Sequence, residues 1–370
     1  MIPVTKPYLP SRKKLERLID GIYERHWFAN NGQLVQELTH RLEEYLGVEN
    51  LLLVANGTLA LQVAYRVLGL RELDEISGGE AVTAPFSFVA TASSLRWEGV
   101  KPVFADIDPS TWCLSPSAVN LALSQETRAI VPVHVYGNAC NVEEIDAIAK
   151  KRNLSVIYDA SHAFGVKHNG ESLLKHGDAA TLSFHATKLF HTGEGGAIVF
   201  RRKKDLELAR KVINFGITGP DKIDGLGINA KMSELQAALG LCVLDEIDDN
   251  LNKREAIWNK YKKELSSHVQ LQELRESLEY NYAYFPALFD SEKQAVRVAK
   301  KLEENGIQSR RYFYPSLDLI DVFRSNSFCP TSNDIASRIL CLPMFNELRW
   351  FDQRKIIELV KGELGALSFS

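Results

Sequence analysis

Short apolar runs alternate with amphipathic helical stretches through most of this chain, and this alternation restricts the possible fold more than any other feature. After the run at residues 51–54 come a turn at Asn56-Gly57 and a helical stretch to about residue 68. Similar strand-like runs lie at residues 81–84, 102–106, 129–133, 156–159 and 197–200. Because strands separated by helices line up in parallel, the pattern predicts an α/β fold with a mostly parallel sheet covered by helices.

The pattern changes near residue 250, where we expect the sheet domain to end with a long helix over 232–249. Beyond it the sequence predicts a charged helix from about 251, a strand at 282–289 and helices at 293–305 and 352–364. We therefore predict a large domain over residues 12–248 and a smaller α+β domain over 249–370. Whether residues 1–11 pack near the small domain is left open.

Charge and cysteine content exclude several classes of partner. The 370-residue chain has a formal net charge of only -3, so no broad attraction to nucleic acid or to an anionic membrane is expected. Its five cysteines are scattered and never form a C-x-x-C pair, which argues against a disulfide framework or a zinc site. No apolar stretch resembles a signal peptide or a membrane span. We expect a soluble, cytoplasmic protein without a metal.

Lys188 and Asp159 together indicate a pyridoxal phosphate site. Lys188 ends the segment 183–188 and is followed by the glycine-rich segment 193–196. A lysine that forms a Schiff base must be held rigidly and partly desolvated, so that its amine is nucleophilic near neutral pH. The apolar run before Asp159 would deliver the carboxylate to the carboxyl end of a strand, where it can pair with the pyridine nitrogen of the cofactor.

The tripeptide Asn56-Gly57-Thr58 lies where a strand gives way to a helix, a favourable place for a phosphate. Free backbone N–H groups and the helix dipole attract an anion there, Gly57 permits close approach and Thr58 adds a hydroxyl donor. For the tripeptide by itself, an ordinary helix cap is the alternative. Phe88 could lie flat on a planar heteroaromatic ring, whereas a phenylalanine taken alone is more often part of the core.

The histidines of this region allow more than one interpretation. His162, three residues after the aspartate, can hydrogen-bond the phenolic oxygen of the cofactor, orient the aspartate or play a purely structural part. His185 and His191 flank Lys188, but no acidic or cysteine partner at ligand spacing supports a metal site. Glu194, between glycines, is more simply a turn carboxylate than a catalytic group.

These motifs together resemble the DegT/DnrJ/EryC1/StrS family of sugar aminotransferases, within fold type I of the pyridoxal phosphate enzymes. The resemblance covers nearly the whole chain. It includes the segments 2–4, 27–32, 56–61, 132–137, 159–165, 183–196 and 229–238. So many matches in the same order make chance implausible, and they imply the large sheet domain and smaller α+β C-terminal domain of that fold type.

The resemblance assigns four residues to the ring of the cofactor. Lys188 would hold it as a Schiff base, and Asp159 would bind its ring nitrogen. Phe88 would stack on the ring. His162 stands where many family members have glutamine and would contact the phenolic oxygen.

The resemblance assigns four more residues to the phosphate of the cofactor. Gly57, Thr58 and Ser183 would bind it from the same chain. Asn229 would reach it from the neighbouring subunit, because family members build the site across a homodimer. A monomer would then be poorly active.

The implied activity is ping-pong transamination of a nucleotide-linked keto sugar. L-Glutamate would leave its amino group on the cofactor and the keto sugar would then receive it, with Lys188 moving the proton in both halves. Family members that deoxygenate C3 have histidine in place of this lysine. A non-catalytic sensor of the same fold is the alternative from another class, but no helix-turn-helix segment or basic face supports it.

The identity of the sugar is inferred from four segments. Residues 183–185 and 312–318 resemble members that aminate C4 of a 4-keto-6-deoxyhexose, and residues 2–10 and 27–32 resemble enzymes that make dTDP-4-amino-4,6-dideoxy-D-glucose. We therefore predict formation of that compound from dTDP-4-keto-6-deoxy-D-glucose, for a surface polysaccharide such as the O-antigen of lipopolysaccharide or for another glycan.

One alternative to that substrate assignment stays open, which is amination at C3 of an NDP-3-keto-6-deoxyhexose. Lys231 replaces a more familiar arginine and Asp318 replaces a histidine, so the details of substrate recognition also stay open.

Overall fold

The computed structural model describes residues 1–70, 79–323 and 327–365. At its centre is a seven-stranded sheet in the order β1-β9-β8-β5-β4-β2-β3. Its strands are β1 (Leu51–Val54), β2 (Glu80–Thr83), β3 (Lys101–Phe104), β4 (Thr127–Val131), β5 (Ser155–Asp159), β8 (Ala179–Ser183) and β9 (Gly196–Phe200). Only β9 is antiparallel to its neighbours, β1 and β8. The prediction of an α/β fold with a mostly parallel sheet is confirmed.

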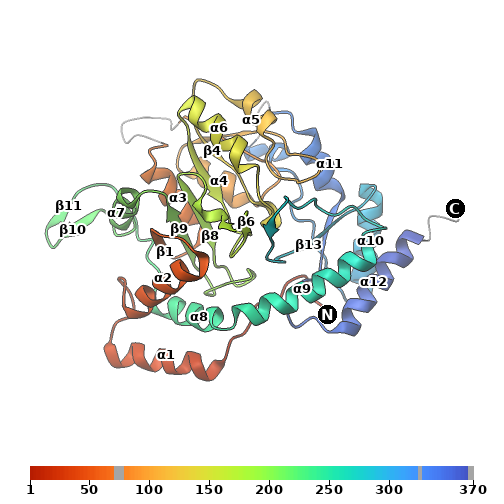
Figure 1. Cartoon of the computed structure of the whole chain (residues 1–370), viewed down its shortest axis with the longest axis horizontal. Helices are drawn as coiled ribbons and strands as arrows, with labels where there is room; N and C mark the ends of the chain where they lie inside the picture. The colour runs from red at the N-terminus through yellow and green to blue at the C-terminus, as the bar shows by residue number, and fades with distance from the viewer. Residues whose placement is uncertain (71–78, 324–326, 366–370) are drawn as a thin grey trace.

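Helices cover both faces of the sheet, which explains why its strands are continuous apolar runs. In β1, Leu51 and Leu53 belong to one buried cluster and Leu52 and Val54 to another, because successive side chains point to opposite faces. The helices α2 (Gln33–Leu46), α6 (Val142–Arg152) and α8 (Glu234–Leu244) share the first cluster, and α3 (Gly57–Val67) and α7 (Lys203–Val212) share the second (Figure 1).

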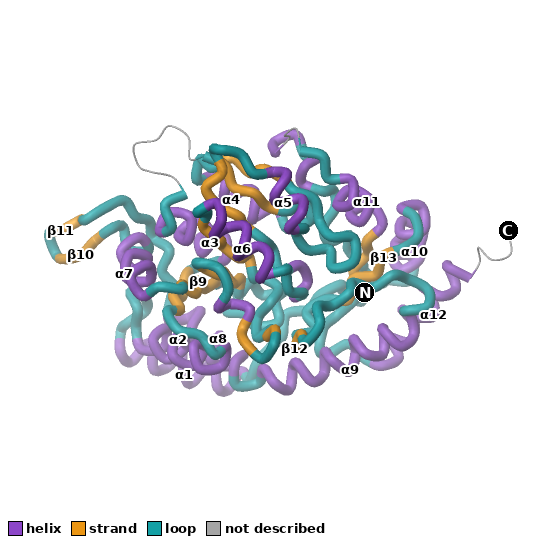
Figure 2. The backbone as a smooth tube through the Cα atoms, turned by 45° about the horizontal axis from the view of Figure 1, so that its top comes forward, coloured by secondary structure: helices purple, strands orange, loops and turns teal. Residues whose placement is uncertain are grey.

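The other elements of the first two thirds of the chain surround this sheet. They are α1 (Arg12–Arg25), α4 (Val89–Trp97), α5 (Pro116–Ala122), β6 (Lys167–His168), β7 (Glu171–Ser172), β10 (Ile217–Gly219) and β11 (Lys222–Ile223). The hairpin β10–β11 projects from the body of the molecule, at the left of Figures 1 and 2.

The last third of the chain forms a second, smaller body of helices around a two-stranded sheet. Its elements are α9 (Ile247–Leu265), β13 (Phe285–Leu288), α10 (Glu292–Glu304), α11 (Pro330–Arg338), β14 (Ile339–Leu342) and α12 (Trp350–Gly365). The short strand β12 (Leu278–Glu279) pairs instead with β6, in the three-stranded sheet β12-β6-β7. Figure 2 shows α9 running from below the large sheet toward α10 and α12. The N-terminal segment joins this body, since Ile2 forms a parallel bridge with Ile307.

The prediction of one helix over 232–249 is wrong, because the chain breaks between α8 and α9. The side chain of Ser233 accepts the N–H of Gln236 and the side chain of Gln236 bonds back to Ser233, which fixes the start of α8. At the other end, Glu246 leaves the helical conformation with φ -115° and ψ 10°. The neighbouring Asp245 forms ion pairs with α1 and α2, so tertiary contacts hold this break.

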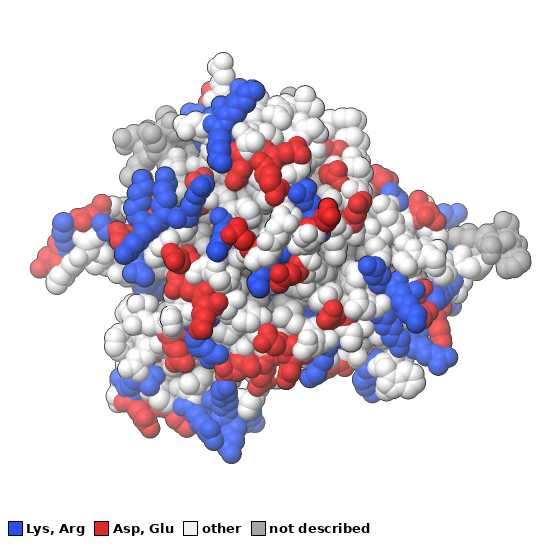
Figure 3. All heavy atoms as spheres, in the orientation of Figure 1, with Lys and Arg blue, Asp and Glu red and all other residues white. Residues whose placement is uncertain are grey.

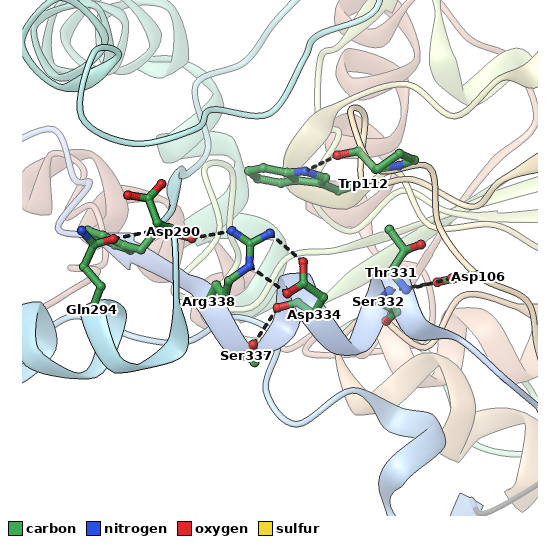
Figure 4. Close-up of polar contacts among 11 residues, drawn as sticks. Asp106, Trp112, Asp290, Gln294, Thr331, Ser332, Asp334, Ser337 and Arg338 are labelled. Carbon is green, nitrogen blue, oxygen red and sulfur yellow. Dashed lines mark hydrogen bonds and ion pairs between the residues drawn. The ribbon is translucent and has the colours of Figure 1, made fainter.

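A carboxylate from the large sheet anchors α11 (Figure 4). Both oxygens of Asp106, which follows β3, accept backbone N–H groups at the start of α11, from Thr331 and Ser332 at 2.9 Å each. At the other end of the helix, Arg338 pairs with Asp334 and donates to the carbonyl of Phe289. The bonds of Asp106 satisfy orphan N–H groups at the start of α11 and tie this helix to the large sheet.

Two findings bear on the predicted partners. On the face drawn in Figure 3, acidic and basic side chains are intermixed rather than gathered into one basic surface. In the described ranges no helix is long and apolar enough to cross a membrane, and no cluster of three or more potential metal ligands occurs.

Candidate active site

A cavity of about 840 Å³ opens where the carboxyl ends of β5 and β8 meet the start of α3. Of the residues predicted to form the site, all but Asn229 line it: Gly57, Thr58, Phe88, Asp159, His162, Ser183 and Lys188. The smaller body closes the opposite wall with Tyr284, Arg310, Tyr312 and Phe313. The cavity therefore lies at the position where open α/β sheets commonly bind ligands.

Asp159 ends β5 and is held firmly at the base of the cavity. One carboxylate oxygen accepts the hydroxyl of Thr91 on α4 at 2.7 Å, and the other accepts the backbone N–H of Ser161 at 3.1 Å. The side chain is only 5% exposed. A carboxylate so fixed presents a directed negative charge to a cationic group in the cavity.

Lys188 lies in the loop between β8 and β9. The backbone N–H of Lys188 donates to the carbonyl of His185 at 2.8 Å, and its Nζ lies 3.4 Å from the hydroxyl of Tyr284. Burial lowers the pKa of Lys188 to about 8, although the charge of Asp159 opposes that shift. The amine is therefore substantially neutral, and so nucleophilic, in mildly alkaline solution.

The start of α3 leaves backbone donors free for an anion. The side chain of Asn56 caps the helix by accepting the N–H of Leu59 at 2.9 Å, which leaves the N–H groups of Gly57 and Thr58 to face the cavity. Ser183 packs closely against Gly57, since a Cβ at Gly57 would lie 2.8 Å from the Cβ of Ser183. Ser183 thus adds a hydroxyl beside two backbone donors.

His162 is neutral and stacked among aromatic rings. Its Nδ1 accepts the backbone N–H of Tyr136 at 3.2 Å, so the proton resides on Nε2. Burial lowers the pKa of His162 well below its usual value, and the charge of Lys188 adds to the effect. Its ring is 5.6 Å from that of Phe313, with an angle of 9° between them. Phe88 is 51% exposed, which leaves a ring face available to the cavity.

The remaining histidines and Glu194 have local partners. His191 Nε2 bonds the carbonyl of Tyr8 at 2.8 Å, a structural contact. His185 Nδ1 bonds the hydroxyl of Thr187 at 2.8 Å, and its Nε2 lies 3.7 Å from the carboxylate of Glu194. Both His185 and Glu194 line the cavity mouth.

Three residues singled out in the sequence lie away from this cavity. Asn229 is exposed and bridges to Asn214 at the base of the β10–β11 hairpin. Lys231 donates from Nζ to the side chain of Asn214 at 2.7 Å. Asp318 is buried and accepts the hydroxyl of Ser316 at 2.6 Å, so it stabilises its own loop.

The residues that sequence reasoning missed come mainly from the smaller body. Tyr284 is the third residue of the run 282–289 predicted as a strand, and Arg310 follows the predicted helix 293–305, but neither position carries a motif. Thr91 could have been found from its position one helical turn after Phe88, since both would face the same side of α4.

The cavity suits pyridoxal phosphate on the chemistry of its walls. Gly57 lets the N-terminus of α3 approach Ser183 closely, since a Cβ there would collide with Ser183, and this helix N-terminus offers N–H groups to a phosphate. The buried carboxylate of Asp159 and the amine of Lys188, whose pKa is lowered to about 8, line the same cavity. Lys188 and Asp159 would hold the ring, and Gly57, Thr58 and Ser183 would hold the phosphate.

Known proteins resemble this chain over nearly its full length. The model of the DegT/DnrJ/EryC1/StrS aminotransferase family matches residues 11–361. A dTDP-4-amino-4,6-dideoxy-D-glucose transaminase of Shigella dysenteriae is 42% identical, covering 93% of this chain and 94% of its own. An Escherichia coli protein of the same name is 35% identical over 98% of this chain and 99% of its own. The solved structure of DesI in the presence of its TDP-sugar product has a TM-score of 0.91 at 30% identity, covering 100% of this chain and 96% of that one.

Proposed function

Because this chain belongs to the DegT/DnrJ/EryC1/StrS aminotransferase family and is a pyridoxal phosphate-dependent sugar aminotransferase, we propose that it aminates dTDP-4-keto-6-deoxy-D-glucose at C4. The product is dTDP-4-amino-4,6-dideoxy-D-glucose and the amino donor is L-glutamate. The observation that carries this proposal is the likeness to two transaminases named for that product, at 42% and 35% identity over almost the whole chain. The activated amino sugar would serve the assembly of a surface polysaccharide such as O-antigen or of another glycan.

The chain's own residues account for binding and proton transfer. When bound, pyridoxal phosphate supplies an aldehyde that accepts amino groups and a ring that withdraws electrons. Lys188, whose pKa of about 8 makes its amine a base near neutrality, takes the proton from the donor α carbon and later delivers one to C4 of the sugar. Asp159 would keep a positive charge on the ring nitrogen, and neutral His162 would donate from Nε2 to the phenolic oxygen.

The test is a product analysis. Purified protein is incubated with pyridoxal phosphate, L-glutamate and dTDP-4-keto-6-deoxy-D-glucose, and the position of the new amine is determined by NMR. We expect an amine on C4, and none with Lys188→Ala. No aminated sugar, while glutamate still converts the cofactor, would refute the assigned substrate.

A second copy of the chain completes the proposed site. Beside Asn229, the β10–β11 hairpin and its base expose apolar side chains that a partner would cover: Phe215, Ile217, Ile223, Leu226 and Ile228, between 38% and 71% exposed. Single exposed apolar residues are normal on a protein surface, whereas a group of them marks a site of contact with another protein. In the proposed dimer, Asn229 of one subunit reaches the phosphate in the cavity of the other.

Complementation tests the shared site. Lys188→Ala and Asn229→Ala subunits are mixed, refolded together and assayed at limiting pyridoxal phosphate. A mixed dimer has one site with both residues intact, so we expect activity above that of either variant alone. Strictly additive activities, or a monomer in analytical ultracentrifugation, would contradict the shared site.

A further inference from the structure

Arg310 is the cavity residue whose charge the proposed mechanism does not use. Among the described residues that line the cavity, only Lys188 and Arg310 are basic apart from the histidines, and Lys188 is occupied by the chemistry. A ping-pong enzyme must bind two anionic substrates in turn at one site, an amino acid and a nucleotide sugar. Arg310 is therefore the available permanent cation for a substrate anion.

The position of Arg310 is fixed by backbone pairing and by stacking. Its backbone forms an antiparallel bridge with Cys341 on β14, with the Cys341 N–H donating to its carbonyl at 2.8 Å. Its guanidinium lies 4.8 Å from the centre of the Tyr312 ring. Stacking of this kind uses a face of the guanidinium and leaves its N–H edge free for a bidentate anion. In the described ranges, no carboxylate forms an ion pair with Arg310.

The side chains between Arg310 and Lys188 indicate which anion it receives. The Tyr312 ring under the guanidinium is 5.9 Å from the ring of Tyr284, whose hydroxyl lies 3.4 Å from Lys188 Nζ. The rings of Tyr312 and Tyr284 thus lie between the guanidinium of Arg310 and the amine of Lys188, which moves the proton. An α-carboxylate is attached to the carbon that loses this proton, whereas the diphosphate of a nucleotide sugar lies beyond the whole sugar ring.

We propose that Arg310, stacked on Tyr312, binds the α-carboxylate of the amino-acid donor. This rests on the proposed function only in requiring an amino-acid donor, not in the identity of the sugar. The nucleotide diphosphate is bound elsewhere, and Arg310 makes no contribution to its affinity. Tyr312 is a positioning residue, because it acts through the guanidinium.

The donor half-reaction tests this proposal without any sugar. Holoenzyme is mixed with L-glutamate, or with whichever standard amino acid converts the wild-type cofactor fastest, and the absorbance change is followed by stopped flow. Arg310→Gln should raise the half-saturating donor concentration on the order of ten- to a hundredfold, the range expected for a lost charge-assisted pair. The half-saturating donor concentration of Arg310→Lys should lie between those of wild type and Arg310→Gln, because lysine keeps the charge but not the planar guanidinium.

Equilibrium binding supplies a second readout and separates the two anions. Calorimetric titration with glutarate and with dTDP should show weaker glutarate binding in Arg310→Gln and dTDP binding within about threefold of wild type. The matched control is Arg311→Gln, because Arg311 also stacks on a tyrosine, Tyr314, but does not line the cavity. Arg311→Gln should bind glutarate and dTDP with the same affinity as the wild type.

Three results would overturn the proposal. Weakened dTDP binding with unchanged glutarate binding would make Arg310 a diphosphate receptor. Unchanged binding of both would leave it without a role in recognition. Equal weakening of both together with an altered cofactor spectrum would make it structural. Failure of the wild-type enzyme to aminate the tested sugar refutes only the sugar assignment, since the donor half-reaction is measured separately.

Discussion

Gly57→Ala should damage cofactor binding while leaving the fold in place. The added Cβ would lie 2.8 Å from the Cβ of Ser183, 3.1 Å from its Cα and 3.2 Å from its hydroxyl. The first of these distances is shorter than carbon atoms tolerate, and the Cα of Ser183 belongs to the end of β8, so a flexible side chain cannot relieve it. The start of α3 and the end of β8 must separate by a few tenths of an ångström.

That separation moves the N–H groups at the start of α3 away from the hydroxyl of Ser183, and these are the donors proposed to hold the phosphate. A charge-assisted hydrogen bond contributes about 1.5–3 kcal/mol, and its optimum is only a few tenths of an ångström wide. Loss of one such bond to the phosphate corresponds to roughly ten- to a hundredfold weaker pyridoxal phosphate binding. Alanine is itself tolerated at the first turn of a helix, so the helix should persist.

The assay is titration of apoprotein with pyridoxal phosphate, followed by absorbance, with circular dichroism as the check on the fold. Gly362→Ala on α12 is the control, because a Cβ there meets nothing within 4 Å. We expect weakened binding only in Gly57→Ala. Binding within about twofold of wild type would refute the placement of the phosphate at the start of α3.

Three further predictions concern single side chains. Lys188→Ala should abolish transamination with the fold intact; retained turnover in the product assay would contradict the mechanism. The rate at which pyridoxal phosphate reacts with wild-type apoprotein should rise with pH and level off above about pH 8. The reason is that only the neutral amine of Lys188 reacts, and its pKa is about 8. A rate that still rises steeply near pH 10.4, about the pKa of an ordinary lysine, would contradict the lowered pKa. Glu234→Ala should lower the free energy of unfolding by about 2–4 kcal/mol, since this fully buried carboxylate accepts the N–H groups of Leu34 and Val35 at 3.0 and 2.9 Å; denaturant unfolding measures the change, and a loss below about 0.5 kcal/mol would count against it.

The parts of the fold that follow from local patterns were predictable. Continuous apolar runs identified β1, β2, β3, β4, β5, β9 and β13 but not β8, and helical spacing identified α2, α3, α6, α10 and α12. The break between α8 and α9 was missed, because apolar spacing continues across it. Its cause is partly tertiary, since Asp245 pairs with basic residues of α1 and α2.

The sequence by itself determined the large-domain wall of the site and the chemistry it implies. Asp159 and Gly57 lie at a strand end and a helix start, which local sequence specifies through apolar runs, capping and glycine, and Lys188 lies in the loop before the glycine-rich segment 193–196. The other wall depended on tertiary structure. Tyr284 and Arg310 come from the last third of the chain, and they reach the cavity only because tertiary packing places this part of the chain against the large sheet. Local periodicity carries no information about contacts between residues so far apart in the chain, so neither Tyr284, the partner of the lysine amine, nor Arg310 in the same cavity could be found before the fold was known.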